Sequence, residues 1–305
     1  MTEEKKIPVI WAVGGGKGGV GKSIIGTFIA FWLSRMGKKT VLVDTDLGGA
    51  NVHTLMGIKN PPRSLNDFLA KKYSSLNDIC IDSEVNGLRL ITGAGEILSL
   101  ANPKFAQKIK IMKGILKLDA DQVILDLGAG SSYNTLDFFL MAEKKLVVVT
   151  PQPTSIQNAY SFIRGAVYRR LSQLTSRDPS ISALIQTAMN PKNELQMRTI
   201  KELCQVIEDL EGAEASKEIK KDLGKIRPII VTNMVREPSD KNAGKIVQLV
   251  AEKYLTIRSE NFGTVVYDRQ IEQMISEMTP LVRISQSSEF FGCVYDIVIK
   301  ALEPN

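Results

Sequence analysis

Two lysines lie within one glycine-rich segment near the start of the chain. Residues 14–23 read Gly-Gly-Gly-Lys-Gly-Gly-Val-Gly-Lys-Ser, and residues 16–23 match the phosphate-loop pattern G-x-x-x-x-G-K-[ST] in full. In such a loop consecutive backbone N–H groups point at an anion, and the N-terminus of the following helix adds partial positive charge. Lys22 would then reach the β- and γ-phosphates, and the Ser23 hydroxyl would bind Mg²⁺. The predicted nucleotide-binding residues of this loop are Gly16, Lys17, Gly18, Gly19, Val20, Gly21, Lys22, Ser23 and Ile24.

The segments on either side of the loop have the patterns of a strand and a helix. Residues 7–13 are an apolar strand candidate, and residues 40–43 are a second one. Between them, apolar residues recur at the three- and four-residue spacing of a helix face: Ile25, Phe28, Ile29, Trp32, Leu33 and Met36. This order predicts a βαβ unit with a parallel sheet. A glycine-rich linker is the alternative interpretation of the loop, but linkers rarely lie between a strand and a helix.

Carboxylates follow two of the strand candidates. Asp44 and Asp46 end the run that begins at residue 40, and Asp126 ends the apolar run Val-Ile-Leu-Asp. Ligands of open parallel sheets bind beyond the carboxyl ends of the strands, so these acids are candidates for chemistry. Asp126 has the pattern of a Walker B aspartate, which holds Mg²⁺ through water. The glycines that would let the following loop switch between backbone states are Gly128 and Gly130.

The early lysine, Lys17, gives the loop a resemblance to the deviant Walker A loop of the MinD/ParA/nitrogenase-iron-protein group of ATPases. In that family this lysine reaches the nucleotide of the partner subunit, so the resemblance implies that Lys17 acts in trans. Residues 41–52 resemble the switch I segment of the same family, which includes Asn51. The resemblance implies that Asp46 orients the attacking water at the metal site and that Asp44 supports the metal's hydration shell. An Asp turn that only ends a strand is the alternative.

Two further segments resemble the flagellar-number (FlhG/FleN) branch of this family. The first is Asp-Leu-Gly-Ala-Gly at residues 126–130, where the division-site (MinD) branch commonly has a proline before the alanine. The second is Thr-Pro-Gln-Pro-Thr-Ser at residues 150–155, which opens a helix in that branch. Thr154 or Ser155 is the expected N-cap of this helix. Both segments favour the same branch.

The resemblance continues near the C-terminus, where the base of the nucleotide would bind. Asn233 ends an apolar strand candidate and resembles the asparagine that contacts adenine in the family, since its amide can both donate and accept. Tyr267 and Asp268 follow the last strand candidate, in the position of the loop beside the nucleotide. Relatives usually have proline where Val266 stands, and this departure leaves the base contact less defined.

The family pattern is interrupted after Tyr168. Relatives pass from this helix almost directly to the next strand, whereas here about residues 171–226 intervene. Within this segment, helical spacing predicts one packed face, made of Met197, Ile200, Leu203, Ile207 and Leu210. Residues 211–225 are charged and predicted to be helical or frayed. This helical insertion could recruit a partner or be a neutral elaboration. The arginines before and within it are interpreted as a solvated helix face: Arg164, Arg169, Arg170 and Arg177.

Composition narrows the class of protein. The chain has 305 residues, 44% hydrophobic and 24% charged, with a net charge of +6, which is typical of a globular protein and permits weak attraction to nucleic acid or anionic membranes. No export signal is visible at the N-terminus, and three isolated cysteines provide no paired metal or redox motif, so we expect a cytoplasmic protein. No basic amphipathic tail follows the last helix candidate, which makes membrane binding doubtful.

These observations predict one α/β domain over residues 1–305, with a twisted, mainly parallel sheet flanked by helices on both faces. The resemblance implies Mg²⁺-dependent ATP hydrolysis, an ATP-dependent homodimer released by ADP, and an unidentified regulatory protein partner. The expected catalytic residues are Lys17, Lys22 and Asp46. A positioning ATPase for flagella or cell division is favoured. The alternatives are a ParA-type DNA-segregation ATPase and an iron–sulfur or redox ATPase, the latter disfavoured by the lack of paired cysteines.

Overall fold

One eight-stranded sheet forms the centre of the molecule. The computed structural model describes residues 7–46, 49–93, 105–176, 178–189, 199–285 and 287–303. The strands are β1 (Val9–Gly14), β2 (Thr40–Asp44), β3 (Ile81–Asp82), β4 (Leu88–Ile91), β5 (Gln122–Asp126), β6 (Lys144–Val149), β7 (Pro228–Val235) and β8 (Glu260–Val266). Their order across the sheet is β3-β4-β2-β5-β1-β6-β7-β8, and all pairs are parallel except β3 with β4. The predicted mainly parallel α/β fold is confirmed.

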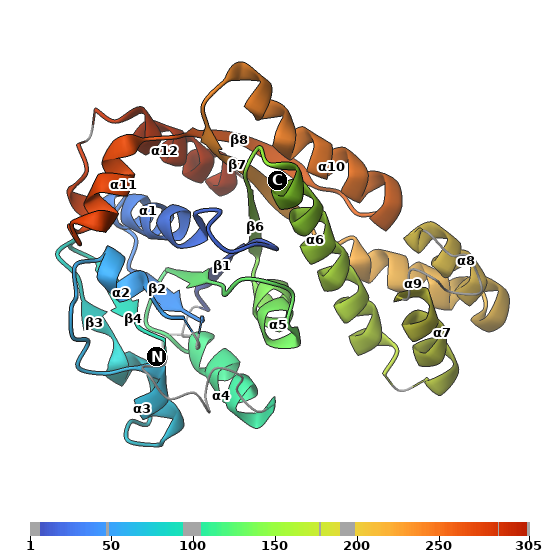
Figure 1. Ribbon diagram of the computed structural model, residues 1–305. Coiled ribbons are helices and arrows are strands. Elements are labelled where there is room, and N and C mark those ends of the chain that lie inside the picture. Colours follow the sequence, from blue (N-terminus) through green and yellow to red (C-terminus); the bar gives the residue numbers. More distant parts are fainter. Residues whose placement is uncertain are drawn as a thin grey trace.

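Helices cover both faces of this sheet (Figure 1). The helices are α1 (Lys22–Arg35), α2 (Val52–Leu55), α3 (Leu65–Leu69), α4 (Phe105–Ile115), α5 (Tyr133–Met141), α6 (Pro153–Leu174), α7 (Pro179–Met189), α8 (Ile200–Glu211), α9 (Ala213–Leu223), α10 (Asn242–Leu255), α11 (Arg269–Ser276) and α12 (Glu289–Leu302). Short 3₁₀ turns lie at Leu76–Ile79, Pro238–Lys241 and Leu281–Arg283. Among the described residues, no helix is both long and apolar enough to cross a membrane.

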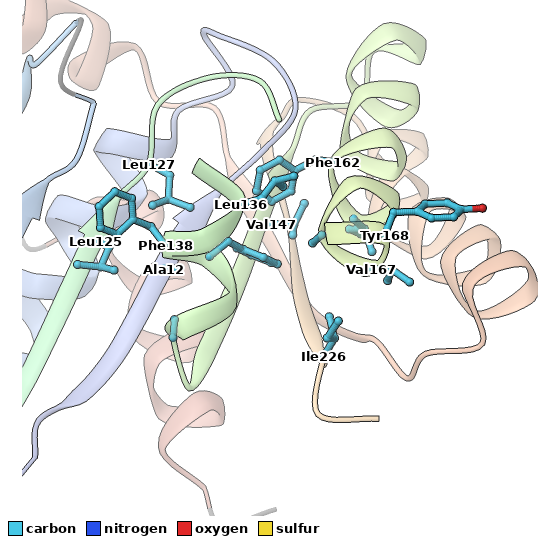
Figure 2. Packing of buried hydrophobic residues seen from close by; sticks show 14 of the residues in the cluster. Ala12, Leu125, Leu127, Leu136, Phe138, Val147, Phe162, Val167, Tyr168 and Ile226 are labelled. Atoms are coloured by element: carbon cyan, nitrogen blue, oxygen red, sulfur yellow. The ribbon is translucent and has the colours of Figure 1, made fainter. Parts of the chain in front are cut away.

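The strands are apolar on both sides, so each strand contributes alternate residues to two separate cores. In β5, Val123 and Leu125 join the core under α3 to α6 and α10, whereas Ile124 joins the core under α1, α11 and α12. Figure 2 shows part of the first core, where Leu136 of α5 and Phe162 of α6 pack beside the sheet. Continuous apolar strands of this kind are typical of parallel sheets buried on both faces. The two cores fix the carboxyl edge of the sheet, where the glycine-rich loop lies.

The segment inserted after Tyr168 is helical. It contains the end of α6 and then α7, α8 and α9, which Figure 1 shows grouped beside the C-terminal half of α6. Thr199 caps α8 through a capping box with Glu202. The predicted packed face of α8 is confirmed for its three buried members, Ile200, Leu203 and Ile207, but Leu210 is 63% exposed because it lies in the last turn, and Met197 is outside the described residues.

Two of the arginines expected on a solvated face are ion-paired instead. Arg169 binds Asp137 of α5 with both its Nε and Nη2 atoms, and Arg170 binds Asp222 of α9. These carboxylates lie far away in the sequence, so spacing along the helix could not reveal them. That interpretation is therefore wrong for both residues, and Arg177 lies outside the described residues.

Candidate functional site

The glycine-rich loop connects the end of β1 to the start of α1, as predicted. Two glycines have a visible structural reason. A Cβ atom on Gly16 would lie 1.9 Å from the backbone oxygen of Asn158 in α6. Gly21, directly before α1, has a φ of +91°, a conformation that side chains with a Cβ rarely adopt. The loop therefore lies tightly against α6 and ends in a turn directly before the N-terminus of α1, the end of a helix that attracts anions.

Lys22 lies inside this loop and not on the surface of the protein. It is only 8% exposed, and its Nζ donates to the backbone oxygen of Lys17 at 3.3 Å. Burial lowers the pKa of Lys22, while the nearby charges of Asp126 and Asp46 act in the opposite direction. A buried cation surrounded by loop amides is suited to an anionic ligand such as a phosphate chain.

Two buried carboxylates stand side by side at the same edge of the sheet. Strands β2 and β5 are neighbours, and their register places Asp44 directly opposite Asp126. Asp126 is 2% exposed, its Oδ1 atom has no hydrogen-bond partner among the described residues, and the Ser23 side chain hydrogen bonds to it. Asp44 accepts hydrogen bonds from the backbone N–H groups of Asp46 and Val52, both at 3.1 Å.

Burial shapes the acidity of this pair. Burial, and then the neighbouring Asp44, raise the pKa of Asp126 to about 8, and burial raises the pKa of Asp44 to about 7. An unpaired buried carboxylate oxygen is costly unless a cation binds it. The side-chain oxygens of Ser23 and Asp126 are suitable ligands for Mg²⁺, which usually keeps several water ligands and also binds phosphate oxygens of the substrate. The residues present therefore fit a magnesium ion bound together with a nucleotide.

This raised pKa has a testable consequence for stability. In an unfolded chain the pKa of Asp is about 3.9, so the folded protein holds a proton on Asp126 that the unfolded chain releases. The stability tied to this group is fully present below about pH 4 and is lost as the pH rises through about 8. We expect Asp126→Asn to raise the free energy of unfolding by about 3 kcal/mol at high pH and by much less at low pH.

Urea unfolding of the metal-free and nucleotide-free protein at about pH 5 and about pH 9 measures this difference. Asp121→Asn, at the opposite end of β5, is the matched control and should give no pH-dependent gain. A variant that is equally or less stable than the wild-type protein at the higher pH would show that the charge on Asp126 is not the cause.

The segments that follow Asp44 and Asp126 contact each other at the carboxyl edge of the sheet. Asp46 is half-buried and lies beside Gly128, where a Cβ atom would be 3.1 Å from its Cγ atom. Gly130 has a φ of +82°, so the loop after Asp126 turns sharply there. Asn51 is exposed and precedes α2, and its backbone also hydrogen bonds to Asp44. The predicted switch residues are thus brought together at one edge.

Lys17 is bound within its own chain in this structure. Its Nζ donates to the Gln152 side chain at 3.3 Å and to Thr154 Oγ1 at 3.1 Å. The expected N-cap of α6 is wrong: the helix begins at Pro153 with Gln152 as its cap position, and Ser155 Oγ instead accepts from the Thr150 N–H. Sequence analysis missed Gln152 as a partner of Lys17, although its place just beyond β6 puts it at the ligand edge.

The three residues expected at the base lie near the ends of β7 and β8. Asn233 is buried, and its Nδ2 donates to Val20 O of the loop at 2.9 Å. Asp268 caps α11 and accepts from Ser288 Oγ at 2.6 Å. Tyr267 lies under Arg236, whose Cζ atom is 3.8 Å from the ring centre. Asn233 thus contacts the phosphate loop directly, whereas Tyr267 and Asp268 contact Arg236, after β7, and Ser288, before α12.

Comparison with known proteins agrees with this geometry. A family model described as ParA, NUBPL iron-transfer P-loop NTPase, matches residues 6–165. An ATP-binding protein of Methanocaldococcus jannaschii is 30% identical over 195 residues, which are 64% of this chain and 70% of that protein. The antiactivator FleN of Pseudomonas aeruginosa is 32% identical over 155 residues, 50% of this chain and 54% of FleN, so the chain spans about half of that relative.

Solved structures show the same fold across the chain. The septum site-determining protein MinD of Pyrococcus horikoshii, complexed with Mg-ADP, superposes with a TM-score of 0.64 and 17% identity and covers 97% of both chains. At this identity the likeness shows the fold alone. The family model, however, matches more than half of the 305 residues. The chain belongs to the ParA family of P-loop NTPases.

Proposed function

We propose that this protein is a Mg²⁺-dependent ATPase that switches between a monomer and an ATP-bound homodimer. One observation carries the proposal: a phosphate loop with two lysines, one buried beside the paired carboxylates and one at its outer rim. The buried lysine, Lys22, serves the nucleotide of its own subunit. Lys17 serves the nucleotide of the partner subunit and leaves Gln152 and Thr154 when the dimer forms.

The proposed reaction is in-line attack of water on the γ-phosphorus of ATP, which yields ADP and phosphate. Lys22 and the loop amides neutralise charge on the phosphates, and Asp46 orients the water. Ser23 and Asp126 would hold Mg²⁺, which would neutralise negative charge on the phosphates. Asn233 contacts the adenine and fixes the loop through Val20. Asp44 holds the chain around Asp46 by its two backbone hydrogen bonds.

The proposed role is spatial positioning, as for a flagellar or division site, by a cytoplasmic protein with a regulatory partner. The similarity to FleN supports it, together with the two segments that resemble the flagellar-number branch. The proposed architecture is one ATPase domain with the insertion mounted on it. A DNA-segregation ATPase is the second candidate, supported by the net charge of +6 and by the family. Steeply salt-dependent, ATP-dependent DNA binding would favour that candidate.

An iron-transfer role is suggested by the description of the matching family model. Such a role needs cysteines that can meet at one cluster. Cys80, Cys204 and Cys293 are all unpaired and lie on separate elements, after the first 3₁₀ turn, in α8 and in α12. We therefore rank this role below the other two.

Light scattering of the wild-type protein with Mg-ATP and with Mg-ADP tests the proposed switch. We expect the mass to double with ATP and to return to that of the monomer with ADP, because only the γ-phosphate gives Lys17 a ligand across the interface. A mass that is the same with both nucleotides would contradict the dimer switch, while ATP binding measured in the same samples would still test the nucleotide site.

A further inference from the structure

Two consecutive arginines of α6 bind carboxylates of two different helices. Arg169 forms a two-pronged ion pair with Asp137 of α5, with Nε–Oδ1 at 2.7 Å and Nη2–Oδ2 at 2.9 Å. The next residue, Arg170, pairs with Asp222 of α9, in the insertion. One point on α6 therefore contacts both the helix that follows β5 and the inserted helices.

The α5 end of this connection begins at the nucleotide site. The loop after Asp126 passes Gly128 beside Asp46, and its Ala129 lies close to Gly18 of the phosphate loop. Ser132 then caps α5 by accepting from Thr135 N at 3.2 Å. Helix α5 thus continues directly from the loop that would sense the γ-phosphate.

Asp137 is the rigid centre of the connection. Its side chain is 6% exposed and accepts from Lys108 of α4, from Arg169, and from Gln173 of α6 at 2.8 Å. The guanidinium of Arg169 also lies over the ring of Tyr133, the first residue of α5, at 4.6 Å. A buried carboxylate with several charged donors resists separation from them, so α5 and α6 must move together.

The α9 end of the connection lies beside an open pocket. Asp222 also accepts from Lys225 at 2.8 Å and so fixes the C-terminal end of α9. An open pocket of about 290 Å³ lies between α6, α7 and α9, with Leu174, Ile181 and Ile219 among its lining residues.

We propose that Arg169 and Arg170 couple the conformation of the loop at residues 126–132, which depends on the bound nucleotide, to the arrangement of helices α7 to α9. The insertion is then the part of this ATPase through which a binding partner regulates it. The coupling rests on the proposed function, since it needs a nucleotide to drive it. By linkage, whatever binds α7 to α9 and prefers one of their arrangements changes the affinity for ATP by the same factor.

Hydrogen–deuterium exchange of the full chain, with and without Mg-AMPPNP, tests the coupling. In the wild-type protein we expect the nucleotide to change exchange at α9 by about 5-fold or more, together with protection of the phosphate loop. In Arg170→Gln the phosphate loop should still be protected, while the change at α9 is lost. Lys220→Gln, which breaks an exposed pair with Glu208 inside the insertion, is the matched control and should keep the response.

Each outcome is decisive. Protection of the phosphate loop with no change at α9 in the wild-type protein would overturn the coupling and leave the ATPase intact. Absence of protection at both places would overturn the proposed function and the coupling together. Arg170→Lys keeps the positive charge and should restore part of the change at α9 that Arg170→Gln loses. If Arg170→Gln had instead lost the structure of the insertion, restoring the charge would not bring the change back. An Arg170→Gln protein that responds like the wild type would also overturn the proposal.

Discussion

Lys22→Ala is expected to reduce both ATP affinity and hydrolysis by about 10²–10³-fold. Lys22 is the buried cation of the loop and lies near Asp126 and Asp46, and its Nζ donates to the backbone oxygen of Lys17 at 3.3 Å. Without Lys22, the phosphates would face two carboxylates with no compensating positive charge, so both the affinity for ATP and the rate of hydrolysis should fall. Isothermal titration with ATP and Mg²⁺, followed by a phosphate-release assay, measures the two losses.

The control for this variant is Lys38→Ala, which removes an exposed lysine beyond the end of α1 and should change neither quantity. Circular dichroism shows whether the loop variant folds. Retained nanomolar-to-micromolar ATP binding in a folded Lys22→Ala protein would remove the main assignment at the phosphate loop.

Asp46→Ala is expected to separate binding from turnover. We expect hydrolysis to fall by about 10²–10⁴-fold, the usual contribution of a group that positions or activates water. ATP affinity should change little, because Asp46 lies beside Gly128 and contributes no side-chain donor to the phosphates. The ATP-bound dimer should therefore accumulate, since its only exit is the slowed hydrolysis.

Steady-state phosphate release and light scattering together measure this effect. Asp82→Ala, an exposed carboxylate on β3 away from the site, is the control and should behave like the wild-type protein. Undiminished hydrolysis in Asp46→Ala would reject the water-orienting role, and a variant that no longer binds ATP would assign Asp46 to binding instead.

The fold could be predicted from the sequence because its signals are local. The phosphate loop, the apolar run before Asp44 and the run before Asp126 each carry their own pattern, and parallel strands bring all three to one edge of the sheet. Their exact partners could not be predicted in the same way. Asp44 faces Asp126 only because β5 lies next to β2 in the sheet. The same pairing lets the Thr45 hydroxyl donate to the backbone oxygen of Asp126, 81 positions away in the sequence.

Errors in the prediction arose where a tertiary contact decided the outcome. Arg169 was expected in solvent, but its carboxylate partner is 32 positions away on another helix. The contacts of Lys17 with Gln152 and Thr154 within its own chain were likewise not predicted, and its role toward a partner subunit stays a prediction.

The same contacts distinguish the carboxylates from the phosphate loop. Burial raises the pKa values of Asp44 and Asp126, so we expect a cation bound at these carboxylates to stabilise the folded protein. Asn233 and the close approach of Asn158 to Gly16 hold the phosphate loop in place meanwhile. The buried carboxylates are therefore the destabilising part of the site, and the phosphate loop is its rigid part.

A mixing experiment tests most directly the claim that Lys17 works on the nucleotide of a partner subunit. Lys17→Ala keeps its own nucleotide site but has no lysine to offer, and Lys22→Ala offers Lys17 but cannot hold ATP. Each protein alone should be nearly inactive, whereas a mixture should hydrolyse ATP, with the greatest rate near equal amounts. If every ratio stays as inactive as the separate proteins, Lys17 does not act across a dimer and the two-subunit account is contradicted.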